Sequence, residues 1–201
     1  MGCGTCAAAC PTSALQIELN IRRGVLEPVR DESRCTHCGR CLAVCPGRQV
    51  PLDLLSDQFL DGAEYQKRLG RYRRLCLGAA ADAQMRYHGA SGGLVTALLI
   101  HALETKRIDG AIVLGNDSED PLLTRPMLAR TRAEIIAANG SKYCPAAVNM
   151  MLGKIRQQPG RYAVVGLPCH VHAIRKWQLI DPVLRERIPY VFGLFCANSN
   201  T

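Results

Sequence analysis

The sequence predicts a small α+β module rich in cysteine, followed by an α/β domain whose mainly parallel sheet is covered by helices. Seven of the 11 cysteines precede residue 46. From about residue 91 onward, short apolar stretches of strand length alternate with helical patterns, which favours an α/β domain. The 201 residues are 48% hydrophobic and 21% charged, a composition that excludes an intrinsically disordered chain.

Two cysteine runs share the spacing C-x2-C-x2-C-x3-C followed by proline. The second run is complete and consists of Cys35, Cys38, Cys41 and Cys45. The first run lacks its first cysteine and consists of Cys3, Cys6 and Cys10. A loop of this kind holds one face of an iron–sulfur cube with three thiolates, and its fourth cysteine ligates the neighbouring cube. We therefore expect two [4Fe–4S] clusters.

Crossed ligation divides the cysteines into two sets. One cube is expected to bind Cys10, Cys35, Cys38 and Cys41, and the other to bind Cys3, Cys6 and Cys45. The alternative is a zinc ribbon. Zinc takes its four ligands as two separated pairs, so it fits this spacing less well than a cluster does.

The missing cysteine falls immediately before Met1. Either one cube lacks a protein ligand and is incomplete or labile, or the chain is a fragment cut just inside the first motif. We favour the fragment, because the other end also stops in polar loop sequence, six residues after an expected strand. The α/β domain is then incomplete at its C-terminus.

A hairpin is expected between the two runs. Residues 15–21 alternate apolar and polar side chains, Arg23-Gly24 permits a turn, and residues 25–29 form the second strand. A duplicated cysteine loop around a short hairpin resembles the bicluster ferredoxin module, over residues 1–47. Residues 48–70 are expected to be a linker.

The elements of the α/β domain follow from apolar periodicity and capping signals. Strands are expected at residues 108–114, 162–166 and 188–195. Helices are expected at residues 91–106 with Ser91 as N-cap, 131–140 with a capping box, 145–157 and 170–179.

Three loops of this domain contain residues whose side chains or backbone groups are suited to ligand binding or catalysis. Residues 89–93 form a glycine-rich turn at a helix N-terminus, which favours an anion, although such a turn is often only a turn. Residues 140–145 place a cation, an aromatic ring and a thiol together, or form a plain surface loop. Cys169 begins a helix, where a thiolate is stabilised, but a buried inert thiol is the simpler alternative.

These three loops, in this order, resemble the family of coenzyme F420 hydrogenase and dehydrogenase β-subunits, which includes the reductase of 7-hydroxymethyl chlorophyll. The resemblance spans about residues 71–196 and rests on residues 90–97, 109–113, 141–143 and 164–169. It implies an N-terminal-type domain over residues 71–160 and the start of a truncated C-terminal-type domain over residues 161–201.

The resemblance also implies a flavin, usually FAD, in the α/β domain. The flavin exchanges hydride with coenzyme F420 or a related organic substrate and passes single electrons to the clusters. Carried over by position, the residues around the flavin's polar parts are Ser91, Gly92, Gly93 and Thr96, and those beside it are Ser141, Lys142 and Tyr143. Lys142 and Tyr143 are the expected catalytic residues, since a lysine offsets negative charge on a reduced flavin.

Members of this family also hold a cluster in the body. Three cysteines at expected element ends are hypothesised to ligate a third cluster: Cys144, Cys169 and Cys196. Cys76 is the least secure fourth ligand, and a missing ligand could equally follow Thr201. His170 is a minor candidate for assisting proton transfer.

The net charge of +8 is concentrated between residues 67 and 74. The five cations there are Lys67, Arg68, Arg71, Arg73 and Arg74. A solvated face is the simplest explanation. An acidic partner or an anionic cofactor comes next, and nucleic acid last because no binding motif accompanies the charges.

We expect a redox partner protein or a hydrogenase or dehydrogenase catalytic subunit, and a small-molecule hydride donor or acceptor. The longest apolar stretch, residues 94–100, is far shorter than the ~20 residues of a membrane span. The N-terminus does not read as a basic-then-apolar leader, so a cytoplasmic location with reduced thiols is expected. Two other functions stay open: a non-enzymatic ferredoxin-like carrier or docking module, and an enzyme that uses Cys169 as nucleophile.

Overall fold

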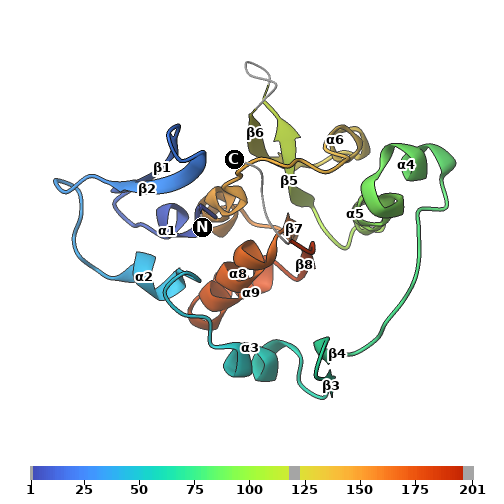
Figure 1. Ribbon diagram of the computed structural model, residues 1–201, viewed down its shortest axis with the longest axis horizontal. Coiled ribbons are helices and arrows are strands. Elements are labelled where there is room, and N and C mark those ends of the chain that lie inside the picture. The colour runs from blue at the N-terminus through green and yellow to red at the C-terminus, as the bar shows by residue number, and fades with distance from the viewer. Residues whose placement is uncertain (1, 118–122, 197–201) are drawn as a thin grey trace.

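The computed structural model describes residues 2–117 and 123–196, and Figure 1 shows them as a module, an arm and an α/β body. The module contains α1 (Thr5–Ala8), β1 (Leu15–Asn20), β2 (Val25–Arg30) and α2 (Arg40–Val44). The arm contains α3 (Leu52–Phe59), β3 (Glu64–Gln66) and β4 (Gly70–Tyr72). The helical elements of the body are α4 (Ala83–His88), η1 (Ala90–Gly93), α5 (Leu94–Glu104), α6 (Arg132–Ala137), η2 (Val148–Met151), α7 (Leu152–Gln157), α8 (Pro168–Ile180) and α9 (Pro182–Arg187). Its strands are β5 (Gly110–Asn116), β6 (Thr124–Ala129), β7 (Tyr162–Gly166) and β8 (Tyr190–Gly193).

The module is a structural repeat around a hairpin. β1 and β2 pair antiparallel, as expected, and Gly24 in the turn adopts a φ of 61°. Each cysteine run leads into a short helix that starts after a glycine of positive φ, Gly4 at 84° before α1 and Gly39 at 73° before α2. The similar backbone geometry of the two glycines supports the duplication inferred from the cysteine spacing.

The stretch expected to be a linker is instead partly ordered as the arm. Its elements are too short for a clear periodic signal, since β3 and β4 have three residues each and α3 buries only Leu55. The Arg175 guanidinium of α8 lies 4.5 Å from the centre of the Phe59 ring, a cation–π contact that holds α3 against the body.

The body has a four-stranded sheet in the order β6-β5-β7-β8. β7 pairs parallel with β5 and β8, which confirms the mainly parallel prediction, and β6 pairs antiparallel with β5. β6 was not predicted. It carries Pro126, which lacks a backbone donor and is tolerated here because β6 is an edge strand of the described sheet.

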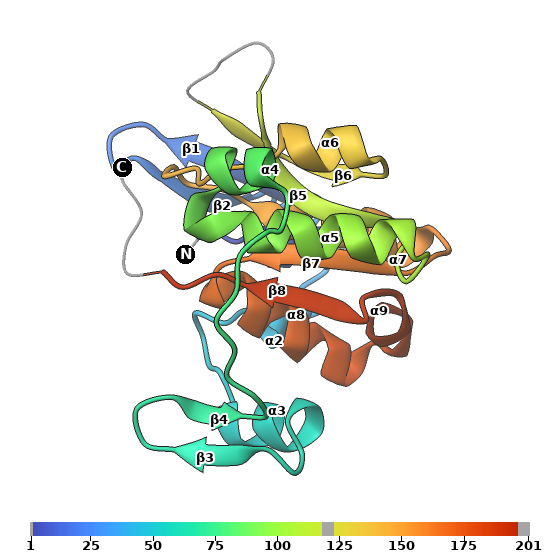
Figure 2. The ribbon, with the colours of Figure 1, turned by 90° about the vertical axis from the view of Figure 1, so that its right-hand side faces the viewer.

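Alternate residues of the central strands enter two separate cores. Ile112 and Val164 pack on the face covered by α7, α8 and α9, whereas Ala111 and Ala163 pack on the face covered by α5 and α6. Figure 2 shows α5 and α8 on opposite sides of the sheet. This two-residue alternation is what a sheet buried on both faces requires.

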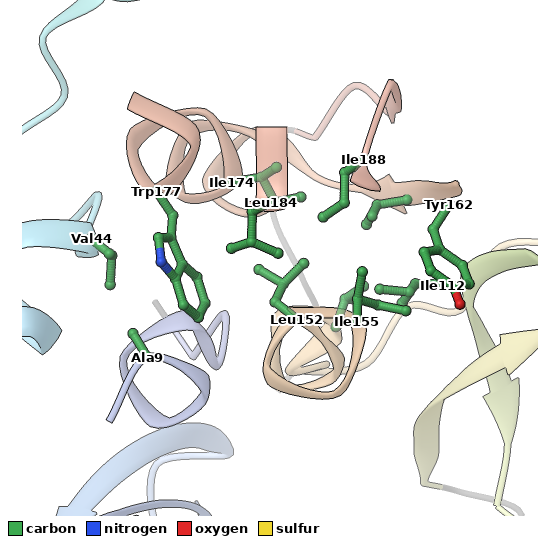
Figure 3. Packing of buried hydrophobic residues seen from close by; sticks show 12 residues of the cluster. Ala9, Val44, Ile112, Leu152, Ile155, Tyr162, Ile174, Trp177, Leu184 and Ile188 are labelled. Atoms are coloured by element: carbon green, nitrogen blue, oxygen red, sulfur yellow. The ribbon is translucent and has the colours of Figure 1, made fainter. Parts of the chain in front are cut away.

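The module shares one core with the body. Ala9 and Val44, from the module, join the buried cluster that contains Trp177, Ile174 and Leu152, and Figure 3 shows Trp177 beside both module residues. The Lys176 ammonium also donates to the carbonyl oxygens of Cys45 and Gln49, each at 2.7 Å. The two cysteine runs are therefore held in a fixed position on the α/β body.

Three expected element boundaries are corrected by the structure. Ser91 does not cap a helix; it adopts φ 49° in a left-handed turn, and α5 begins at Leu94. The helix expected from residue 145 starts only at η2. The last strand is shorter than residues 188–195, and Phe195 is exposed. By contrast, β7 and the capping box of Thr131 and Glu134 match the prediction.

Asp181 joins α8 to α9 and gives a prediction about acid stability. Its carboxylate accepts from the Leu184 N–H at 3.1 Å and from Arg156. Burial raises the pKa of Asp181, but the bonds from Arg156 and the backbone outweigh burial, so the net pKa is lowered. The unfolded chain therefore binds this proton more readily. The stabilisation is fully present above the unfolded pKa of about 3.9 and is lost as the pH falls from there through the lower folded-state pKa.

We expect Asp181→Asn to keep the helix cap but to weaken the fall in stability between pH 5 and 3. Asp181→Ala should lose a further ~1 kcal/mol at neutral pH, because Ala cannot cap α9. Urea unfolding at several pH values measures both effects. An Asn variant with the same acid dependence as the original chain would contradict this role.

Candidate functional site

Four thiols surround a cavity of about 180 Å³ beside the hairpin. They are Cys10, Cys35, Cys38 and Cys41, which the spacing assigned to one cube. In the described parts of the chain, no three His, Cys, Asp or Glu side chains converge closely enough to hold a single metal ion. The lining of one cavity by cysteines of both runs is the arrangement that a shared iron–sulfur cluster requires. We call these four residues the outer set.

Hydrogen bonds prepare one member of the outer set for ligation. The Ala14 N–H donates to the Cys10 sulfur at 3.2 Å, and the Thr12 hydroxyl lies 3.6 Å from the same sulfur. Burial raises the pKa of Cys10, but these bonds outweigh it and lower the net pKa. The thiolate, which is the form that binds iron, is thereby favoured.

The remaining module cysteines, Cys3, Cys6 and Cys45, form an inner set against the body. The pKa of Cys6 is raised by burial first and then by the charges of the Cys3 and Cys45 thiolates. Each of these two charges disfavours a negative charge on Cys6. Bound iron would offset this repulsion between thiolates, which is the chemistry that cluster ligation by this set would supply.

The body cysteines divide into two places. The pKa of Cys169 is raised by burial, then by the charge of Cys3 and, more weakly, by that of Cys196. Cys144 instead hydrogen-bonds to the Thr124 hydroxyl of β6 at 3.5 Å. Cys76 is exposed. Cys169 is thus coupled electrostatically to Cys3 and to Cys196, whereas the described contact of Cys144 is with β6.

His170 is engaged at both ring nitrogens. Nδ1 accepts from the Leu167 N–H at 3.0 Å, so Nε2 carries the proton and donates to the Ala146 carbonyl, also at 3.0 Å. Burial lowers the pKa of His170, which keeps the imidazole neutral. These contacts give His170 a structural role, and they leave Cys169 without the adjacent free base that a nucleophile mechanism needs.

A second cavity, of about 410 Å³, lies between α4 and α6. Its lining mixes apolar and polar side chains and consists of Asp82, Gln84, Met85, His88, Arg132, Ile136 and Asn139. Both its size and its mixed lining are typical of small-molecule sites. The sequence did not single out these residues, because they come from two separate short helices with no motif of their own.

The expected flavin residues flank this second cavity without lining it. The buried Thr96 hydroxyl donates to Oδ1 of Asn139 at 3.0 Å. The Lys142 ammonium donates to the carbonyl oxygens of Ala138 and Asn139, both at 2.9 Å, and so caps the end of α6. Burial lowers the pKa of Lys142, and the charge of Cys144 opposes this shift.

The glycine-rich turn is shaped by packing. Ser91, Gly92 and Gly93 have φ values of 49°, 73° and 67°. A β-carbon on Gly93 would lie 2.5 Å from the Met85 carbonyl oxygen, so glycine is needed for close contact with α4. Ser141 lies in the exposed loop after α6, and Tyr143 is exposed in the same loop.

Comparison with known proteins identifies the family of this chain. Residues 75–153 match the family described as coenzyme F420 hydrogenase/dehydrogenase, beta subunit N-term, and residues 160–201 match the C terminus of the same subunit. The chain belongs to the family of coenzyme F420 hydrogenase/dehydrogenase β-subunits. Residues 1–48 match a 4Fe-4S dicluster domain, which confirms the iron–sulfur assignment of the cysteine runs, and a second such match covers residues 27–81.

Several members of this family are similar over much of the chain. The coenzyme F420-dependent sulfite reductase of Methanocaldococcus jannaschii is 27% identical over 98% of this chain and 30% of its own length. The coenzyme F420 hydrogenase subunit beta of Methanosarcina barkeri is 32% identical over 65% of this chain and 46% of its own. The corresponding protein of Methanothermobacter thermautotrophicus is 33% identical over 65% of this chain and 48% of its own.

A solved structure, the F420-reducing [NiFe] hydrogenase complex from Methanosarcina barkeri, aligns with a TM-score of 0.54 and 31% identity. The alignment covers 59% of this chain and 42% of that one. The chain thus spans about a third to a half of the length of these relatives. None of the helices within the described residues has the length and apolarity that a bilayer crossing demands.

Proposed function

We propose that this chain is an iron–sulfur flavoprotein subunit of an oxidoreductase, and that it passes electrons between [4Fe–4S] clusters and a flavin. The flavin would exchange hydride with coenzyme F420 or a related organic substrate. The observation that carries the proposal is the cavity enclosed by the outer set, because crossed cysteine runs meet there as the dicluster spacing requires. The inner set is proposed to ligate the second cluster.

The proposed FAD site is the cavity between α4 and α6. It is supported by the loops of the resemblance that flank it, and by the strained φ of Ser91, since such strain is often retained at ligand-binding turns. When bound, a flavin supplies the conversion between two-electron and one-electron chemistry. Asn139 and Arg132 would bind its polar atoms, and Met85 and Ile136 would exclude water from its ring.

Lys142 contributes charge from a fixed position in this proposal. Its ammonium is held by the carbonyl oxygens at the end of α6, beside the cavity residue Asn139. A positive charge there favours a negatively charged bound ring over a neutral one. Cys169 and Cys196, with Cys144 or another ligand, are proposed to hold a third cluster, and a redox partner or catalytic subunit in the cytoplasm would complete the electron path.

Filling the cavity tests the flavin site. Ile136 is partly exposed on α6 and lines the cavity, so Ile136→Trp should fold normally but occupy the space. After anaerobic reconstitution with iron, sulfide and FAD, we expect at least a tenfold loss of FAD affinity with unchanged iron content. Ile180→Trp, at an exposed site on α8, is the matched control. An original chain that loads iron but no FAD would favour the ferredoxin-like carrier instead.

A further inference from the structure

A buried chain of hydrogen bonds links the inner set to the body. The Asn149 side chain donates from Nδ2 to the Thr5 hydroxyl oxygen at 2.8 Å and to the His170 carbonyl oxygen at 3.0 Å. The Thr5 oxygen lies 3.4 Å from the Cys3 sulfur. The Asn149 N–H also donates to the Cys3 carbonyl at 3.0 Å. Asn149 and Thr5 are both fully buried.

The hydrogen-bond partners of Asn149 determine which atom donates in the contact between the Thr5 hydroxyl and the Cys3 sulfur. Turning the amide would place Oδ1 against the His170 carbonyl oxygen, so Nδ2 must face both acceptors. Because the Thr5 oxygen accepts from Asn149, its own hydrogen is free to point at the Cys3 sulfur. A thiolate at Cys3 can only accept, so Thr5 is the donor.

Asn149 makes these bonds at a cost. Its Oδ1 is buried and has no hydrogen-bond partner among the described residues. An unsatisfied buried acceptor lowers stability, so the gain from this side chain lies in its two donated bonds. One of those bonds orients Thr5.

The equivalent position of the outer set is different. In the repeat, Thr5 after Gly4 corresponds to Arg40 after Gly39, and Arg40 is exposed. A β-carbon on Gly4 would lie 2.7 Å from Met150, whereas nothing lies within 4 Å of one on Gly39. Of the two loops, the inner one is packed against the body and given a buried hydroxyl donor.

We propose that Asn149 and Thr5 are positioning residues that raise the reduction potential of the inner cluster. A donor to a ligand sulfur stabilises the added negative charge of the reduced cluster. One electron is gained and no proton moves, since the hydroxyl hydrogen stays on Thr5. The hydroxyl of Thr5 therefore makes the inner cluster a better electron acceptor than it would be without this donor. This inference rests on the proposal that Cys3 ligates the inner cluster.

The test is a potentiometric titration of the anaerobically reconstituted full chain. Electron paramagnetic resonance monitors the reduction of each cluster during the titration. In Thr5→Val we expect the inner signal to shift to lower potential, with the reduced-to-oxidised ratio at the original midpoint falling roughly threefold or more. Thr5→Ser keeps the hydroxyl and should restore the midpoint. Thr105→Val, at an exposed helix end, should leave both signals unchanged.

Asn149→Leu keeps Thr5 but frees its hydroxyl, so it should give a smaller shift in the same direction, and it carries the test if Thr5→Val does not bind iron. If the variants bind iron but the midpoint potential of the inner cluster does not change, the inference is wrong, although the inner cluster itself is present. A wild-type chain that binds iron only at the outer set would overturn the proposed ligation by Cys3, and the inference with it.

Discussion

Replacing Trp177 with alanine should destabilise the module and the body together, by about 3–5 kcal/mol of unfolding free energy. Trp177 is buried and lies between the module residues Ala9 and Val44 and the α7–α9 core, as Figure 3 shows. Removing the indole leaves a cavity at the contact that both parts share. Urea unfolding measures the loss when backbone circular dichroism and cysteine reactivity in the module are followed in parallel.

The control for Trp177→Ala is Ile180→Ala, because Ile180 lies on the same helix but is 61% exposed. It should cost well under 1 kcal/mol. Coincident transitions for the two probes would agree with one shared core. Two separate transitions, or a loss for Trp177→Ala as small as that of the control, would show that the module folds independently of the body.

Replacing Cys38 with serine should remove the outer cluster and lower the iron content by about four per chain. Cys38 is exposed and lines the outer cavity together with three other cysteines. The inner set should keep its iron, because no member of that set changes. Iron and sulfide analysis after anaerobic reconstitution measures the loss. The signal of the outer cluster should also disappear from the electron paramagnetic resonance spectrum.

Cys76→Ser is the matched control, since Cys76 is also exposed but belongs to neither module set. It should leave iron content unchanged. If Cys38→Ser and Cys76→Ser have the same iron content as the original chain, the outer assignment is wrong. Loss of all iron from Cys38→Ser alone would instead mean that the two cysteine sets do not load separately.

The grouping of the outer set could be predicted from the sequence because it follows from the spacing of the cysteines. Three thiols at x2 spacing can reach one cube, and the cysteine before proline is directed to the other, so the outer set followed without any knowledge of packing. The hairpin and β7 were also predictable, since turn glycine and apolar runs are local signals. The family match confirms the resemblance carried by the three loops.

The parts that could not be predicted depend on contacts distant in sequence. Asn149 gave no signal, because an asparagine in a short 3-10 turn is usually exposed, and its burial depends on the inner loop lying over it. Thr5 could have been noticed by comparing it with Arg40 in the repeat. Lys142 was expected at the flavin, and its binding to the end of α6 follows from how that loop turns back.

The arrangement orders the proposed electron path. The outer set lies at the surface, the inner set lies against the body, and Cys169 is coupled electrostatically to Cys3. An external donor or acceptor would reach the outer cluster first. The inner cluster then connects it to the body, where the flavin is proposed to bind.

The most direct test is photoreduction of FAD in the anaerobically reconstituted chain, with the clusters followed by electron paramagnetic resonance. If electrons pass between the cofactors, cluster signals appear as the bound flavin is reduced, and both cofactors reoxidise together when an electron acceptor is added. If the flavin bleaches while the clusters stay oxidised, although dithionite reduces them in the same sample, electrons do not pass between them and the proposed function is wrong.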